Sequence, residues 1–234
     1  MQRLQNFKPL FLSLLAAVAL SACEGVSETS SASDASQVVT PTEGSTSSGG
    51  QCASGDLCLA LKIVAYSDGT SPVIDSRTAE DIVSRINGVW SQCGIGFRLE
   101  DFQAVEPKNV GLAEIPQNMS ELPQIRGTLQ SSNQLLVVMT DGWGSAGNIN
   151  DSGADAWTTL PGYPPYGAVI DEPVARNANI IAHELGHYLD LLHIQNRSNL
   201  LSPVVGASSR GLSSGQCSTA RATAQGVFAP MLRS

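Results

Sequence analysis

The chain has 234 residues, a formal net charge of −8 at pH 7 and a hydrophobic fraction of 42%. Its length and apolar content are sufficient for a single domain with a sizeable core, which we expect to be monomeric. The acidic balance, with only scattered Lys and Arg, argues against a nucleic-acid-binding protein, because such proteins need a basic surface.

Residues 1–22 have the composition of an export signal. Arg3 and Lys8 supply a positively charged start, and the apolar run from Pro9 to Leu20 is too short for a comfortable membrane span. We therefore predict that this segment directs export and is not part of the fold.

The apolar run ends in Leu20-Ser21-Ala22-Cys23, which resembles the lipobox of bacterial lipoproteins. The resemblance implies that the signal is cut before Cys23 and that Cys23 receives a lipid, which attaches the protein to a membrane. Glu24 in the next position favours the outer membrane or the cell surface. The alternative is an ordinary signal peptide with an incidental cysteine.

Residues 23–50 are predicted to form a flexible linker. Positions 24–50 hold eight Ser and four Thr and almost no large apolar residues. Such a segment cannot bury enough apolar surface to offset the entropy lost on ordering. An inhibitory propeptide is the alternative, although the segment is short for that role. The folded domain is therefore assigned to residues 51–234.

Four cysteines remain after Cys23, an even number that suggests two disulfides in an exported chain. Three pairings are possible. We favour Cys52–Cys58 and Cys93–Cys217, the second of which would tie the first helix to the last. No C-x-x-C spacing occurs, so a zinc site built from thiolates is not expected.

The first half of the domain predicts a strand, a helix and a second strand. Residues 57–66 are apolar on both faces, as in a buried strand, and Gly94 separates the helix from the strand at 95–102. Ser76 is the expected N-cap of the helix. Its apolar stripe consists of Ala79, Ile82, Val83, Ile86, Val89, Trp90 and Cys93.

The middle of the chain is less regular. Residues 105–130 predict a loop with a short helix at 119–124, and residues 134–140 predict a buried central strand. The stretch 141–165 is rich in Gly, Asn, Asp, Ser and Pro, which predicts a long loop. Loops of this length more often have a function than serve only as connections. A last strand is expected at 167–170.

Two aspartates in the long loop are weak candidates for calcium binding. Asp151 and Asp155 could help to hold a Ca²⁺ ion, but their spacing fits no known loop motif. A solvated loop is the simpler interpretation.

All three histidines of the protein lie between positions 183 and 193, on and after a helix that should begin near Asn177. His183 and His187 are four residues apart, so they share one helix face and could bind one tetrahedral Zn²⁺ ion. Glu184 would point toward the same ion without ligating it. A carboxylate so placed can serve as a general base that activates water.

His193 lies six residues beyond His187, which on an unbroken helix would turn it away from the shared ion. If His193 binds the same zinc, the helix must end and the chain must bend near Asp190, a residue type that tolerates a left-handed backbone. Two alternatives remain open. Asp190 could be the third ligand on a continuing helix, or the three histidines could pack without a metal.

The stretch from His183 to His193 resembles the metzincin metallopeptidase signature H-E-x-x-H-x-x-G-x-x-H, with Asp190 in the place of the glycine. The resemblance implies an α+β catalytic domain with a twisted, mostly parallel sheet, an antiparallel edge strand, an active-site helix and a C-terminal helix. It also implies that an edge strand at 157–160 binds an extended peptide.

The family places a methionine-containing turn beneath the metal, where this chain has Leu201. The family's methionine is an apolar floor and not a ligand, and a Leu–Met exchange usually costs less than about 1.5 kcal/mol. We therefore expect the site to survive this departure.

The sequence after His193 argues against zinc sites that take a further ligand from that part of the chain. It contains no Asp, Glu or His, so no distant carboxylate can complete the motif, and no Tyr, so the extra tyrosine ligand of some metzincins is absent. Ser213 or Ser214 should cap a final helix that runs past Cys217.

The predicted function is that of an exported, lipid-anchored zinc endopeptidase, with His183, His187 and His193 as metal ligands and Glu184 as general base. Its partners would be a peptide or protein substrate and, through Cys23, a membrane. The alternative is a lipid-anchored module on a metzincin-like scaffold that binds peptides without cleaving them. Asp190 and Leu201, the two departures beside the site, motivate that alternative.

Overall fold

The computed structural model describes residues 21–25, 51–144 and 154–234 of the chain. The predicted signal peptide and linker therefore lie outside the described residues, apart from Ser21–Gly25, and so does the candidate calcium ligand Asp151. Within the described part of the chain, no helix is both long and apolar enough to cross a membrane.

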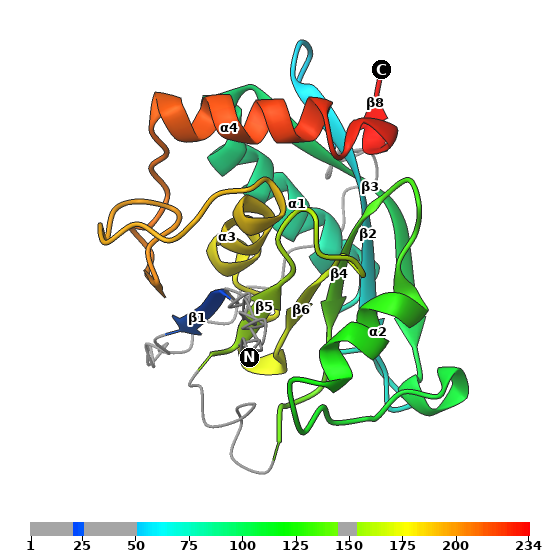
Figure 1. Cartoon of the computed structure of the whole chain (residues 1–234). Helices are drawn as coiled ribbons and strands as arrows, with labels where there is room; N and C mark the ends of the chain where they lie inside the picture. The colour runs from blue at the N-terminus through cyan, green and yellow to red at the C-terminus, as the bar shows by residue number, and fades with distance from the viewer. Residues whose placement is uncertain (1–20, 26–50, 145–153) are drawn as a thin grey trace, which may run out of the picture.

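An eight-stranded sheet forms the centre of the molecule, in the order β3-β2-β4-β6-β5-β1-β7, with β8 paired to β2 (Figure 1). Strands β3, β2, β4 and β6 are mutually parallel, whereas β5 runs antiparallel to β6. The strands are β1 (Ser21–Gly25), β2 (Leu57–Tyr66), β3 (Ile95–Val105), β4 (Leu135–Met139), β5 (Ala156–Thr158), β6 (Ala168–Ile170), β7 (Val204–Val205) and β8 (Leu232–Arg233).

Four α-helices of the described residues pack on this sheet. The residues of α1 (Ser76–Trp90), α3 (Ala178–Tyr188) and α4 (Ser214–Gln225) share one apolar cluster, while α2 (Glu121–Leu129) packs on the opposite face (Figure 1). The mixed architecture and mostly parallel sheet expected from the sequence are confirmed.

Side chains that alternate between the two faces of the sheet produce the two apolar layers. In β2, Leu61 and Ile63 belong to the cluster around α1 and α3, whereas Val64 and Tyr66 belong to the cluster around α2. Successive side chains of a strand point to opposite faces, so a strand covered on both sides must be apolar throughout. This explains the hydrophobic run at 57–66, which only Lys62 interrupts.

Some element boundaries differ from those expected. Asp75, not Ser76, caps α1, and its side chain accepts a hydrogen bond from the backbone N–H of Thr78 at 2.7 Å. Aspartate and serine are equally good N-caps, so their order alone could not decide between them. Helix α2 begins later and extends further than the predicted 119–124, and β5 ends at Thr158, not at residue 160.

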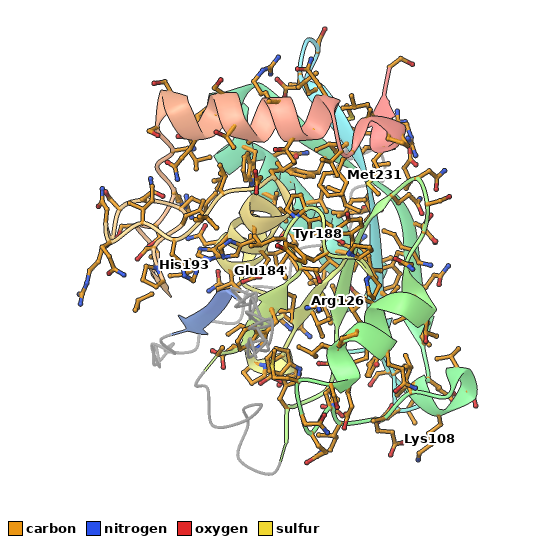
Figure 2. All side chains as sticks on the ribbon, in the orientation of Figure 1. Lys108, Arg126, Glu184, Tyr188, His193 and Met231 are labelled. Atoms are coloured by element: carbon orange, nitrogen blue, oxygen red, sulfur yellow. A yellow bond between two sulfur atoms is a disulfide. The ribbon has the colours of Figure 1, made fainter. Side chains whose placement is uncertain are left out.

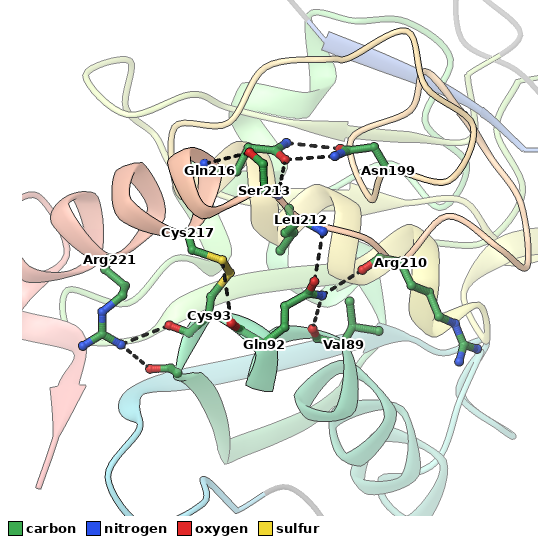
Figure 3. Close-up of a disulfide and its surroundings, with 11 residues drawn as sticks. Val89, Gln92, Cys93, Asn199, Arg210, Leu212, Ser213, Gln216, Cys217 and Arg221 are labelled. Atoms are coloured by element: carbon green, nitrogen blue, oxygen red, sulfur yellow. Dashed lines mark hydrogen bonds between the residues drawn. A yellow bond between two sulfur atoms is a disulfide. The ribbon is translucent and has the colours of Figure 1, made fainter.

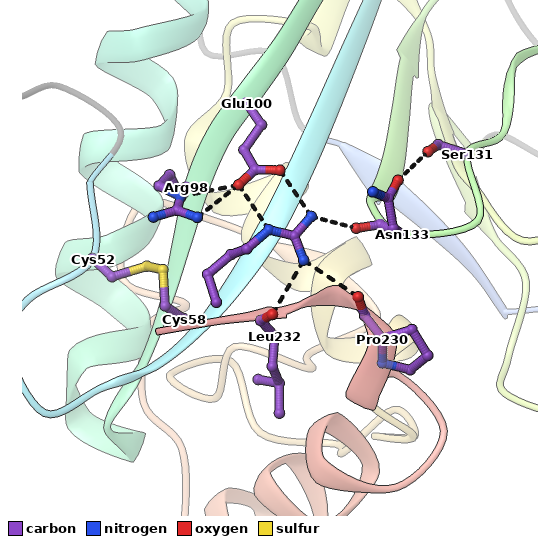
Figure 4. Close-up of polar contacts among 9 residues, drawn as sticks. Cys52, Cys58, Arg98, Glu100, Ser131, Asn133, Pro230 and Leu232 are labelled. Carbon is purple, nitrogen blue, oxygen red and sulfur yellow. Dashed lines mark hydrogen bonds and ion pairs between the residues drawn. A yellow bond between two sulfur atoms is a disulfide. The ribbon is translucent and has the colours of Figure 1, made fainter.

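Two disulfides cross-link the described part of the chain, one between residues six positions apart and one between residues 124 positions apart. They pair Cys52 with Cys58 and Cys93 with Cys217, which is the pairing favoured from the sequence. The first fixes the start of the domain to β2 (Figure 4). The second fixes the turn after α1 to helix α4 (Figure 3). Because α1 also contacts α3, the second bond steadies the layer that supports the histidines.

Candidate metal centre

Helix α3 carries His183 and His187 and has a well-formed N-terminus. The side-chain oxygen of Asn177 accepts hydrogen bonds from the backbone N–H groups of Asn179 at 3.0 Å and Ile180 at 3.4 Å. Every residue of the helix is buried. The two histidines therefore project from a helix that is packed on all sides and cannot easily shift.

The helix ends in a left-handed turn immediately after Tyr188. The N–H of Leu191 donates to the carbonyl of Gly186 at 3.0 Å, and the N–H of Asp190 donates to the carbonyl of His187 at 3.1 Å. Asp190 has φ of 65°. These two bonds and one left-handed residue form a Schellman motif, in which glycine is the usual residue at the position of Asp190. The predicted bend at Asp190 is confirmed.

The bend brings His193 back to the two helical histidines. The Nε2 atom of His183 lies 2.9 Å from that of His187 and 3.2 Å from that of His193, and the remaining Nε2 pair is 3.2 Å apart. Figure 2 shows His193 beside the end of α3, on the side where Glu184 lies. All three imidazoles thus present the same ring nitrogen to one point.

Backbone carbonyls decide the tautomers of the two helical histidines. Nδ1 of His183 lies 2.6 Å from the carbonyl oxygen of Leu200, and Nδ1 of His187 lies 2.7 Å from that of Leu191. A carbonyl oxygen can only accept, so each Nδ1 must carry the proton. The Nε2 atoms of both rings therefore present lone pairs, as metal ligands do.

Burial keeps these rings neutral. Desolvation, reinforced by the neighbouring His187, lowers the pKa of His183 well below its usual value, and burial lowers the pKa of His187 to about 4. Burial also lowers the pKa of His193. Neutral rings are the form that binds cations.

The spacing of the three nitrogens fits a zinc ion. Zn–N bonds of about 2.0–2.1 Å in a tetrahedral site separate the nitrogens by about 3.3 Å. The three Nε2–Nε2 distances of 2.9 to 3.2 Å are close to that value. Among the described residues, His183, His187 and His193 form the only group of three or more potential metal-ligating side chains. Asp190, the alternative third ligand, is exposed in the turn and is not in this group.

Leu201 lies beneath the centre, where the metzincin resemblance places a methionine. Its side chain is fully buried, and a Cβ added to Gly186 would lie only 3.1 Å from its Cδ2 atom. Glycine at 186 therefore allows Leu201 to pack closely against the turn of α3 between the two histidines. Leu201 thus packs against the helix that carries two of the histidines, as an apolar residue in the place where we expected a floor.

The segment that carries Leu200 and Leu201 is held by α4. The side chains of Asn199 and Gln216 exchange hydrogen bonds of 2.9 and 3.1 Å (Figure 3). Gln216 also completes a capping box with Ser213 at the start of α4. This chain of bonds fixes the carbonyl of Leu200, which in turn orients His183.

Glu184 faces strand β5 from the middle of α3. It is fully buried, and its Oε2 atom accepts a hydrogen bond from the hydroxyl of Thr158 at 2.6 Å. The guanidinium of Arg126 reaches β5 from the other face of the sheet and donates to the carbonyls of Trp157 at 2.9 Å and Gly167 at 2.8 Å. Burial lowers the pKa of Arg126 to about 10, while Tyr188 and Glu184 act in the opposite direction (Figure 2).

Thr158 and Arg126 were not predicted from the sequence. Thr158 lies inside the expected edge strand, but nothing in its neighbourhood distinguishes it from Thr159. Arg126 lies in a segment that we expected to be mostly loop, and a buried arginine has no local signature.

Residues 21–25 form a strand on the outer edge of β5. Strand β1 runs antiparallel to β5, with Cys23 opposite Ala156, and parallel to β7, with Glu24 opposite Val204. In this structure the edge strand is not exposed as expected, because residues 21–25 of the same chain cover it. Cleavage before Cys23, which the lipobox resemblance implies, would remove Ser21 and Ala22 and uncover most of that edge. The gap between β5 and β7 accepts one extended strand.

No protein-family model matches the sequence, and no curated protein matches it either. Solved structures do resemble the fold. Mature mirolysin of Tannerella forsythia, in complex with a cleaved peptide, is 12% identical and aligns over 76% of this chain and 96% of that chain, with a TM-score of 0.55. Archaemetzincin from Methanopyrus kandleri is 15% identical over 74% of this chain and 97% of its own, with a TM-score of 0.48.

Metalloproteinase-II from Bacteroides fragilis is 13% identical and aligns over 74% of this chain, with a TM-score of 0.51. The alignment spans only 54% of that chain, so this protein corresponds to about half of it. At such identities the similarity establishes the fold and nothing further. The chain therefore shares its fold with mirolysin and with part of metalloproteinase-II, in agreement with the mixed, mostly parallel architecture expected from the sequence.

Proposed function

We propose that the protein is a zinc-dependent endopeptidase in which His183, His187 and His193 hold the metal and Glu184 is the general base. The observation that carries the proposal is the convergence of three Nε2 atoms at one point, with the Nδ1 protons of His183 and His187 committed to backbone carbonyls. Packing alone would not require three nitrogens to meet in this way.

A bound zinc ion would supply a Lewis acid that polarises the scissile carbonyl and promotes ionisation of water. Glu184 would accept a proton from the attacking water and pass it to the leaving amine. Glu184 is fully buried, which supports a proton transfer that is shielded from bulk water. The neutral imidazoles would stay uncharged at neutral pH and so keep their lone pairs for the ion.

The rim of the site supports a peptide as substrate. Strand β1 pairs with β5 and β7 at the same time, so an extended segment fits between them through backbone hydrogen bonds. The solved mirolysin structure contains a cleaved peptide, which agrees with a rim of this kind. A peptide substrate would take the place that residues 21–25 occupy.

We also propose that the protein is an exported lipoprotein anchored through Cys23 at an outer membrane or cell surface. The support is the segment from Arg3 to Cys23, whose composition and ending resemble a lipoprotein signal. Replacing Cys23 by serine should abolish incorporation of a labelled fatty acid and release the protein from membranes. Unchanged labelling of this variant would refute the anchor.

The proposed activity is tested with a mixed peptide library, with and without a zinc chelator, followed by mass spectrometry of the products. Chelation should stop cleavage and added zinc should restore it. Glu184→Ala should reduce kcat/KM by about 10²–10⁴-fold, the usual contribution of a general base, while zinc stays bound. Asp81→Ala, an exposed carboxylate on α1, is the matched control and should leave cleavage unchanged.

A non-catalytic peptide-binding protein is the second candidate, favoured by the departures at Asp190 and Leu201. It predicts that the zinc-loaded wild-type protein retains peptides from the library but cleaves none of them. Full activity of the Glu184→Ala variant would instead refute Glu184 as the general base and leave the peptidase proposal standing.

A further inference from the structure

The hydroxyl of Thr158 contacts the carboxylate that we assign as general base. The Oγ1–Oε2 distance is 2.6 Å, and both residues are almost completely buried, with exposed fractions of 1% for Thr158 and 0% for Glu184. A hydrogen bond to an ionised carboxylate is about twice as strong as one between neutral groups. This contact links α3 to β5 directly.

Strand β5 is itself held from two directions. In the sheet, Thr158 pairs with Ala168 and Trp157 pairs with Val169 on β6. From the other face, Arg126 donates to the carbonyl oxygens of Trp157 and Gly167. The backbone that carries Thr158 is therefore clamped to the core, and its hydroxyl is a fixed point for Glu184.

We propose that Thr158 is a positioning residue, which holds the Glu184 carboxylate in the orientation that proton transfer requires. The inference rests on the proposed peptidase function. A glutamate side chain has three rotatable torsions, and a misplacement of about 1 Å can cost about 10²-fold in rate. A donor on a rigid strand removes much of that freedom before the substrate arrives.

The position of Thr158 also gives strand β5 two roles, one in pairing with an extended segment and one in orienting Glu184. The outer edge of β5 pairs with an extended segment, as β1 shows, and the same strand directs Thr158 inward to Glu184. Pairing of a peptide with β5 thus fixes its backbone relative to the residue that orients the base.

The kinetic test compares Thr158→Val, which replaces the hydroxyl by a methyl group, with Thr158→Ser, which keeps a hydroxyl. In the zinc-loaded full-length protein, Thr158→Val should lower kcat by about ten- to hundredfold, with KM and zinc content unchanged. Thr158→Ser should restore most of the activity. Thr158→Ala replaces the valine variant if that variant does not fold.

Thr223→Val is the matched control. Thr223 is a buried threonine on α4, outside both β5 and α3, so kcat should be unchanged. Equal kcat values for Thr158→Val, Thr223→Val and the wild type would overturn the positioning role and leave the peptidase proposal intact. An inactive, zinc-loaded wild-type protein would overturn the peptidase proposal and this inference with it.

The second measurement does not depend on activity. In metal-free protein, Thr158→Val should lower the thermal midpoint by several degrees, because the buried carboxylate loses a donor. In a Glu184→Leu background, which has no carboxylate, the same change should have almost no effect. Equal shifts in both backgrounds would show that Thr158 and Glu184 are not coupled and would refute the inference.

Discussion

The two walls of the site are specified in different ways. On one wall, His183, Glu184, His187 and His193 lie within eleven consecutive residues, and backbone geometry alone brings them together. On the other wall, the contacts join residues far apart in sequence: Thr158 is 26 positions from Glu184, and Arg126 is 31 positions from Trp157. Local spacing thus encodes the proposed metal ligands, whereas long-range packing encodes the orientation of the proposed general base.

Removing Arg126 would break the second wall and should have the largest effect on stability. Arg126→Met leaves two buried carbonyls, those of Trp157 and Gly167, without their donor. Each buried unsatisfied group costs about 1–3 kcal/mol, so we expect the free energy of unfolding in urea to fall by about 2–5 kcal/mol.

Arg85→Met is the control for that experiment. Arg85 forms an exposed ion pair with Asp81 on α1, and such pairs contribute less than about 1 kcal/mol. Equal losses in the two variants would mean that the Arg126 clamp does not stabilise β5.

The first wall can be probed by pH in the metal-free protein. The pKa of His187 is lowered to about 4 by burial, whereas an unfolded histidine titrates near 6.5. Between these values the unfolded chain binds more protons, so His187 should reduce stability as the pH falls from about 6.5 toward 4. Burial of Asp171 raises its pKa to about 7 and acts in the opposite direction over much of the same range.

The contribution of His187 is therefore obtained by difference. Urea unfolding at pH 7.5, 6 and 4.5 should show a steeper loss of stability for the wild type than for His187→Asn, because Asp171 is present in both proteins. Identical pH profiles would indicate that the ring of His187 is not buried in solution.

A smaller effect is expected at the turn that joins the two parts of the motif. Asp190 has φ of 65°, where a β-branched residue is strained by about 1–2 kcal/mol. Asp190→Val should therefore lower the free energy of unfolding by about that amount, whereas Asp190→Gly should change it by less than about 1 kcal/mol. A valine variant as stable as the wild type would contradict the left-handed turn.

Much of the first wall could be predicted from the sequence. The four-residue spacing of His183 and His187 places them on one helix face. The offset of His193 requires a bend, and Asp190 marks its position because aspartate tolerates a left-handed backbone. The buried strands β2 and β4 could also be predicted from their apolar residues, because a strand covered on both faces is apolar on both faces.

The rest depended on information that a local pattern does not contain. The N-cap of α1 was misplaced by one residue because Asp75 and Ser76 are both suitable caps. Thr158 and Arg126 act through partners that only the folded sheet brings near. The pairing of residues 21–25 with β5 is likewise a tertiary contact between segments more than 130 positions apart.

The most direct test of the account is a zinc titration of metal-free protein, with the ligands identified by anomalous diffraction at the zinc edge. We predict one zinc per chain, bound by the Nε2 atoms of His183, His187 and His193, and a large loss of affinity in His193→Ala. Absence of stoichiometric zinc, or equal zinc affinity in His193→Ala and the wild type, would contradict the three-histidine centre.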